Sequence, residues 1–106
     1  MKIVFQYFDD CPSHDMALAR LRKVMAEEGV ESSIDIVKVE TSEQANQLEF
    51  VGSPTILING FDISPIIGDH HYALTCRIYE WDKGRISPLP SSQMIREALV
   101  NAKLSE

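Results

Sequence analysis

The sequence predicts an α/β fold, in which a four-stranded mixed sheet carries helices on both faces, with elements in the order β-α-β-α-β-β-α. Two observations support this prediction. Short apolar stretches suited to strands alternate with stretches in which apolar residues recur at helical spacing, and residues typical of caps and turns separate them. A chain of 106 residues is long enough for one core, so residues 1–106 are expected to form a single domain.

The first part of the chain is predicted to be a β-α-β unit. Residues 2–8 are mostly apolar, as in a strand buried on both faces. A helix follows, and proline is favoured at the first helical position, so Pro12 at that position makes Cys11 the N-cap. Gly29 is a typical residue for the end of this helix. Residues 32–40 have the composition of a second strand.

A short second helix and a third strand are predicted next. Thr-Ser-Glu-Gln at residues 41–44 has the pattern of a capping box, which opens a helix through Leu48 that Gly52 ends. Residues 53–58 are predicted to be a strand, because an apolar run follows Ser-Pro-Thr. The Asn-Gly pair at residues 59–60 is a turn signal that closes this strand.

The last part of the chain is predicted to add one strand and one helix. Residues 61–72 have no regular period and are expected to form a loop. Residues 73–81 are predicted to be the fourth strand of the sheet. Ser91 or Ser92 is expected to cap a final helix whose apolar positions recur at helical spacing.

Composition and charge exclude several classes of function. The net charge of −6, with no basic stripe, disfavours nucleic acids and anionic membrane surfaces as partners. No apolar run reaches the length of a membrane span, and the N-terminus does not have the pattern of a signal peptide, so a cytoplasmic protein is expected. Two cysteines cannot build a multi-disulfide framework, and in a reducing compartment both are expected to be thiols unless catalysis oxidises them.

Cys11 is the strongest candidate for a reactive group. At a helix N-cap, unpaired backbone N–H groups and the helix dipole both favour a thiolate. Asp9 and Asp10 act in the opposite direction, whereas His14, one helical turn away, is suited to stabilise the thiolate. The alternatives are that Cys11 is an inert core cysteine and that His14 is a solvated surface residue.

The order of elements, with Cys-Pro before the first helix and Ser53-Pro54-Thr55 before the third strand, resembles the thioredoxin fold. The resemblance covers nearly the whole chain apart from residues 61–72. It implies that Cys11 is the nucleophile and that Pro54 follows a cis peptide bond. It further implies that a substrate chain is held at Pro54, at the backbone of Ser53 and Thr55, and at the two residues after the cysteine, Pro12 and Ser13.

The chain departs from the dithiol pattern of that family, because His14 stands where a second motif cysteine would be. It therefore looks like the monothiol relatives, which include some glutaredoxins, arsenate reductases and peroxiredoxin-like proteins, and like small bacterial proteins described as thioredoxin-family or alkylmercury-lyase-like. The implied function is thiol-based redox chemistry on a protein or low-molecular-weight substrate. Cys11 attacks a disulfide, peroxide or glutathione mixed disulfide, an external thiol such as glutathione resolves the product, and no bound cofactor is needed.

Two other functions remain open from the sequence. A low-pKa thiolate is also a soft ligand for mercury, copper(I) or arsenic(III), provided that another residue or a second protomer supplies a further ligand. Alternatively, the chain keeps the fold as a partner-binding domain without any thiol chemistry.

Cys76 is predicted to be a packing residue and not a resolving thiol. Strand alternation places it on one face with Leu74 and Ile78, and an apolar face is expected to be buried. Pairing with Cys11 would then require a conformational change.

The remaining polar and aromatic signals are weaker. His70 and His71 are adjacent, so in an extended chain they point to opposite faces, and no metal site is expected there. The apolar loop 61–72 is expected to cover the edge of the sheet or to form a homodimer contact. Tyr79 with Trp81 could form such a contact equally well, although core packing explains the same residues.

Overall fold

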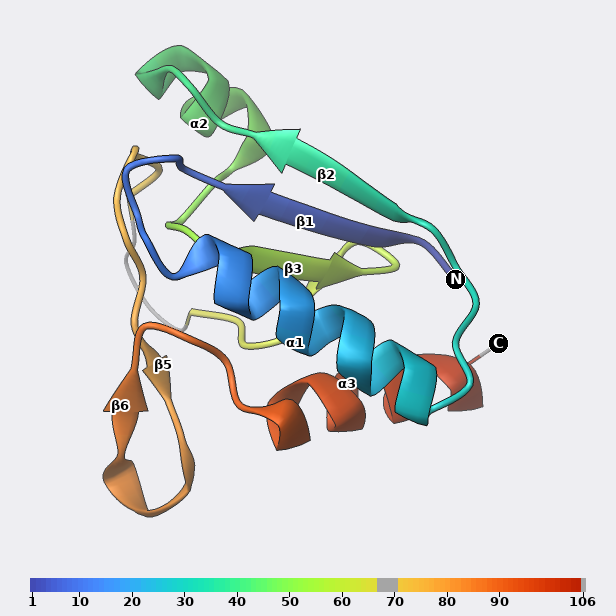
Figure 1. The fold of residues 1–106 in the computed structure, drawn as a ribbon. Coiled ribbons are helices and arrows are strands. Elements are labelled where there is room, and N and C mark those ends of the chain that lie inside the picture. The colour runs from blue at the N-terminus through green and yellow to red at the C-terminus, as the bar shows by residue number, and fades with distance from the viewer. Residues whose placement is uncertain (67–70, 106) are drawn as a thin grey trace.

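The structure, a computed structural model, describes residues 1–66 and 71–105 and contains a four-stranded mixed sheet in the order β2-β1-β3-β4 (Figure 1). β1 (Ile3–Tyr7) pairs in parallel with β2 (Ile34–Lys38) and antiparallel with β3 (Thr55–Ile58). β4 (Phe61–Asp62) then pairs antiparallel with β3. The predicted mixed α/β architecture around a four-stranded sheet is therefore confirmed.

Two long helices, α1 (His14–Glu27) and α3 (Ser92–Leu104), lie side by side against one face of the sheet (Figure 1). Leu21 of α1 and Leu99 of α3 pack there against the apolar side chains of β1 and β3 and are fully buried. We refer to this set as the main core, and its buried residues are Ile3, Phe5, Ala17, Leu21, Val24, Met25, Ile56, Ile58, Leu89, Ile95 and Leu99.

The ends of these helices follow the predicted signals. Gly29 has a φ of 69° just beyond α1, and the following N–H of Val30 donates to the Met25 carbonyl at 2.9 Å, as in a helix ended by glycine. Ser91 is the N-cap of α3, and its hydroxyl accepts a hydrogen bond from the N–H of Met94 at 3.1 Å.

The short helix α2 (Ser42–Leu48) lies beyond the carboxyl ends of β1 and β2 (Figure 1). The predicted cap is present, because the Thr41 hydroxyl accepts from the N–H of Gln44 at 3.0 Å. The predicted stop at Gly52 is wrong, since Glu49 ends the helix in the left-handed conformation. Helices were expected on both faces of the sheet. In the structure α1 and α3 cover one face, whereas α2 lies only at the edge of the other face.

The fourth strand of the sheet is not the one predicted. Asn59 and Gly60 both have positive φ, which suits a tight hairpin, so the chain turns back at once and β4 forms inside the predicted loop. Residues 73–81 do not enter this sheet. They end in β5 (Tyr79–Glu80), which pairs with β6 (Ile86–Ser87) in a separate hairpin around the short helix η1 (Asp82–Gly84) (Figure 1).

Candidate functional site

Cys11 lies in a turn between β1 and α1. Its N–H donates to the Phe8 carbonyl at 3.0 Å, and its own carbonyl accepts from the N–H of His14 at 3.5 Å. Helix α1 begins at His14 with Ser13 as N-cap, so the prediction that Cys11 is the N-cap and Pro12 the first helical residue is wrong. The reason is that Pro12 occupies the second position of the turn, which its fixed φ also suits. Cys11 therefore lies before the N-cap of α1, outside the first helical turn, where the effect of the helix dipole on its sulfur is weaker.

Cys11 forms a disulfide with Cys76, although 65 positions separate them in the sequence. Their Cα atoms are 5.8 Å apart, within the range that a disulfide spans without backbone movement. Cys11 is fully buried, whereas Cys76 is exposed. The prediction that Cys76 is a packing residue, separated from Cys11 unless the protein changes conformation, is therefore wrong.

The wrong prediction came from strand alternation, which placed Leu74, Cys76 and Ile78 together on a buried face. Cys76 and Ile78 point outward, and Ile78 is 66% exposed, while Arg77 and Tyr79 are buried. An apolar pattern normally marks the inner face of a strand, but here the inner face carries a cation and a phenol. Because Tyr79 is buried within the protein, it is also unsuited to the dimer contact considered from the sequence.

The backbone around Cys76 is paired with Ser53. The N–H of Ser53 donates to the Thr75 carbonyl at 2.8 Å, and the N–H of Arg77 donates to the Ser53 carbonyl at 3.0 Å, which forms an isolated parallel bridge. The resemblance implied that the Ser53 backbone would hold a substrate chain. In this structure a segment of the same chain, residues 75–77, holds that position. The Ser53–Pro54 peptide bond is cis, as the resemblance also implied.

Arg77 anchors this segment in the interior. Its Nη1 lies 2.8 Å from the Asp62 carboxylate and 3.3 Å from the Thr55 hydroxyl, and its Nη2 donates to the Ser64 carbonyl at 2.8 Å. Only 3% of its side chain is exposed, and a buried cation requires such partners to offset its lost hydration. Arg77 Nε is the one fully buried side-chain nitrogen or oxygen that has no partner within residues 1–66 and 71–105.

Tyr79 and Gly52 complete the anchor. The guanidinium of Arg77 lies 4.4 Å from the centre of the Tyr79 ring, and the Tyr79 hydroxyl donates to the Pro54 carbonyl. Burial raises the pKa of Tyr79 above its ordinary value, which keeps the phenol protonated as a donor. A Cβ on Gly52 would lie 2.7 Å from the Cβ of Arg77, so Gly52 permits the close approach of the two chain segments.

His14 lies beside the turn that holds Cys11. Its ring stacks on Tyr7 with centroids 4.5 Å apart, and its two nitrogens lie 3.6 Å from Asp9 and 3.3 Å from Asp15. The predicted role of His14 toward the Cys11 sulfur stays a prediction.

The other predicted substrate-binding residues are divided between the surface and the interior. Pro12 is exposed and Ser13 is half-buried at the start of α1. Pro54 is buried, and so is Thr55, whose hydroxyl is engaged by the Gly52 carbonyl and by Arg77. Sequence reasoning missed Arg77 and the groups around it. The available signal was a single arginine within the otherwise apolar or uncharged run of residues 73–79.

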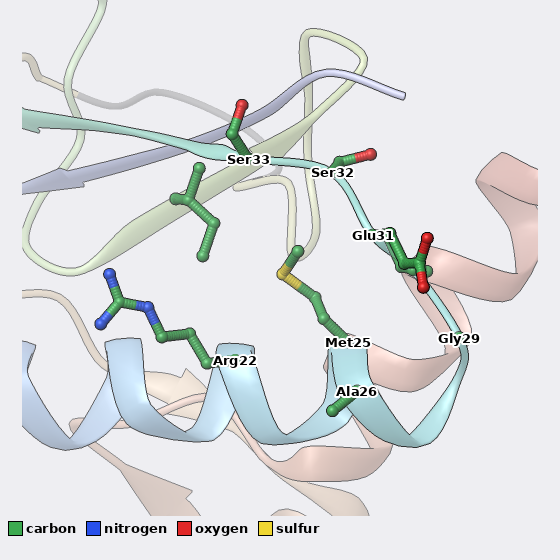
Figure 2. Close-up of a pocket in the computed structure, with 9 residues that line it drawn as sticks. Arg22, Met25, Ala26, Gly29, Glu31, Ser32 and Ser33 are labelled. Atoms are coloured by element: carbon green, nitrogen blue, oxygen red, sulfur yellow. The ribbon is translucent and has the colours of Figure 1, made fainter.

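A groove of about 590 Å³ lies elsewhere, between the second half of α1 and the chain that leads into β2. Figure 2 shows Arg22 and Met25 extending from α1 toward this chain, while the hydroxyls of Ser32 and Ser33 point away from the helix. None of the predicted site residues lines this groove, so it adds nothing to the chemistry of Cys11.

The described residues contain no group of three or more His, Cys, Asp or Glu side chains placed to hold a metal ion. His71 is exposed, and His70 lies outside the described residues. No helix within the described ranges is both long and apolar enough to cross a membrane.

Comparisons of the chain with models of protein families, with curated proteins and with solved structures found no match.

Proposed function

We propose that this chain is a thioredoxin-like thiol–disulfide redox protein in which Cys11 and Cys76 are the working pair. The observation that carries the proposal is their juxtaposition: Cys11 follows β1, Cys76 comes from a segment docked on Ser53, and their Cα atoms are 5.8 Å apart. Cys76 is then the resolving thiol that the Cys-Pro-Ser-His motif lacks. We propose a reducing cytoplasm as its compartment, where disulfides are typically transient and catalytic or sensing.

The thioredoxin-like assignment is supported by several features of the fold. A parallel β1-α1-β2 unit comes first, and β3 pairs antiparallel with β1. A proline, Pro54, comes directly before β3, and the reactive cysteine follows β1. α1 and α3 share one face of the sheet.

In the proposed reaction the dithiol form reduces a substrate disulfide. The Cys11 thiolate attacks one substrate sulfur, a Cys11–substrate disulfide forms, and the other substrate sulfur leaves as a thiolate that takes up a proton. The Cys76 thiolate then attacks the Cys11 sulfur, expels the second substrate thiolate, and closes the Cys11–Cys76 disulfide. Two electrons pass from the dithiol to the substrate.

Regeneration requires an external reductant, for which we propose a low-molecular-weight thiol such as glutathione. In the disulfide form Cys76 is exposed and Cys11 is buried, so the incoming thiolate attacks the Cys76 sulfur and Cys11 leaves as the thiolate. In the proposed dithiol form Cys76 is no longer joined to Cys11, and Cys11 is open to the substrate. A second thiol then releases Cys76, so two thiols become one disulfide and the protein is again a dithiol.

The test is turnover of a small mixed disulfide with glutathione as reductant, followed in the wild type, Cys11→Ser and Cys76→Ser. We expect Cys11→Ser to abolish turnover. Cys76→Ser should accumulate a Cys11–substrate mixed disulfide, visible by intact mass spectrometry. Normal turnover by Cys11→Ser would overturn the proposal, and the absence of any Cys11 adduct in Cys76→Ser would favour a binding domain without thiol chemistry.

One observation also favours the second candidate function, soft-metal binding. When reduced, the same pair would supply two thiolates to one ion, a donor set suited to copper(I) or mercury. Native mass spectrometry of the reduced protein with each metal separates the candidates. If the wild type retains one metal ion, each serine variant loses that ion, and no turnover is seen, soft-metal binding would replace the redox proposal.

A further inference from the structure

The geometry points to an arginine subsite beside the reactive cysteine. We propose that the pocket formed by Asp62, Thr55 and the Ser64 carbonyl selects substrate segments in which an arginine directly follows the substrate cysteine that reacts with Cys11. Arg77 fills this pocket from within the chain. This inference rests on the proposed function, because it names the substrate class of the same site.

The segment Thr75-Cys76-Arg77 is arranged as a bound peptide would be. It is extended, it makes two backbone hydrogen bonds with Ser53 on either side of Cys76, and its cysteine is joined to Cys11. An extended peptide adding to an exposed edge gains affinity from such backbone bonds and specificity from side-chain pockets. The segment is therefore an internal copy of the covalent intermediate between Cys11 and a substrate cysteine.

The pocket recognises guanidinium geometry and not positive charge alone. Nη1 meets the Asp62 carboxylate and the Thr55 hydroxyl, while Nη2 meets the Ser64 carbonyl, so two nitrogens of one planar group are bound in different directions. A lysine ammonium is a single point charge and cannot reproduce this arrangement. The Tyr79 ring stacks on the guanidinium and excludes water from one side.

The pocket is also held by a contact that does not involve Arg77, and it is open on one side. The second carboxylate oxygen of Asp62 accepts the N–H of Ser64 at 2.8 Å, which fixes the loop that carries both acceptors. Asp62 and Thr55 also line a hollow of about 250 Å³ on the face of the sheet opposite α1. The side chain of a second chain therefore has a route to the carboxylate once Arg77 is absent.

The experiment uses short peptides that copy residues 73–79, with the sequence Ala-Leu-Thr-Cys-Arg-Ile-Tyr, and versions with Ala or Lys in place of Arg. The cysteine carries thionitrobenzoate as a mixed disulfide. The Cys11 thiolate attacks the peptide sulfur, the Cys11–peptide disulfide forms, and thionitrobenzoate leaves with the electron pair, so its absorbance reports the rate. The protein carries Cys76→Ser, which removes the internal competitor for Cys11, and Arg77→Ala, which empties the pocket.

We expect the emptied variant to react about tenfold or more faster with the Arg peptide than with the Ala peptide, as one charge-assisted pair provides. The Lys peptide should react at a rate close to that of the Ala peptide. In Cys76→Ser alone, where Arg77 still fills the pocket, this preference should be absent. Cys76→Ser with Arg85→Ala removes an exposed cation instead, and it should behave as Cys76→Ser does.

The outcomes separate this inference from the proposed function. Equal rates for the Arg and Ala peptides in the emptied variant would overturn the subsite and leave the redox proposal standing. No reaction of Cys11 with any peptide, in a variant whose folding is verified by circular dichroism, would overturn the redox proposal itself.

A second measurement covers the case in which Arg77→Ala does not fold. Ethylguanidinium should raise the thermal midpoint of Arg77→Ala, or restore its folding, more than ethylammonium does, because only the former fits the vacated pocket. Adding Asp62→Asn should remove this difference. An equal effect of the two cations would contradict the guanidinium subsite without involving either cysteine.

Discussion

We refer to the set of contacts that hold residues 75–79 in place as the Cys76 anchor. The main core and this anchor are stabilised in different ways. The main core joins α1, α3 and the sheet through apolar side chains that are fully or almost fully buried. The anchor holds residues 75–79 through one disulfide, one buried ion pair and a few hydrogen bonds. Apolar burial spreads stability over many contacts, whereas directional bonds concentrate it in a few groups. The anchor is therefore the region that a single chemical change, reduction of a disulfide, can release.

The largest expected effect on folding lies in the main core. Leu99→Ala removes a fully buried side chain and should lower the free energy of unfolding by about 2–5 kcal/mol, because it leaves a cavity. Denaturant unfolding measures this loss. The equilibrium between the Cys11–Cys76 disulfide and glutathione should stay at the wild-type value in the folded protein, and a clear shift would show that the two regions are coupled.

In the anchor, Asp62→Asn leaves the buried Arg77 without its carboxylate partner. We expect a loss of roughly 3 kcal/mol, at the low end for a broken buried pair because Asp62 keeps some contact with water. Unlike Leu99→Ala, this change should also shift the glutathione equilibrium toward the dithiol, because Cys76 is held less firmly beside Cys11. Titration with glutathione redox buffers and thiol trapping measures the shift. An unchanged equilibrium would mean that Arg77 does not position Cys76.

A smaller effect is expected from Gly52→Ala, which places a methyl group 2.7 Å from the Arg77 Cβ at a φ of 140°. The loss should exceed about 1 kcal/mol, because both the backbone conformation and the close approach are disturbed. Gly84→Ala is the matched control, since its φ is also positive but nothing lies within 4 Å of a Cβ there. Equal losses in the two variants would show that the contact with Arg77 contributes nothing.

The smallest effect concerns the alkaline limit of stability. Burial raises the pKa of Tyr79, so the folded state disfavours the phenolate. The contribution of this shift to the stability of the folded state is fully present at pH values below the unfolded pKa of about 10. Stability should therefore fall as the pH rises above about 10, when the unfolded chain loses this proton more readily than the folded one. Tyr79→Phe should be less sensitive to pH in that range. Thermal unfolding at a series of pH values measures the difference, and identical profiles would contradict it.

The sequence by itself determined several of the helix ends and the helical part of the main core. Gly29 ended a helix because a left-handed residue is needed there, and Thr41 and Ser91 capped helices because their hydroxyls satisfy free N–H groups. Helical spacing of apolar residues identified Leu21 and Leu99 as core. These are rules about residues within a few positions of one another, so no knowledge of distant contacts was required.

Only the tertiary structure decided the partner of Cys11 and the inner face of residues 74–79. The pairing with Cys76 depends on chain segments 65 positions apart, a relation for which the sequence has no local signal. Arg77 faced inward because Asp62, Thr55 and Ser64 supply the charge and hydrogen bonds that a buried guanidinium needs. Apolar periodicity assigns a cation to the surface by default, and a specific set of distant partners reversed that assignment.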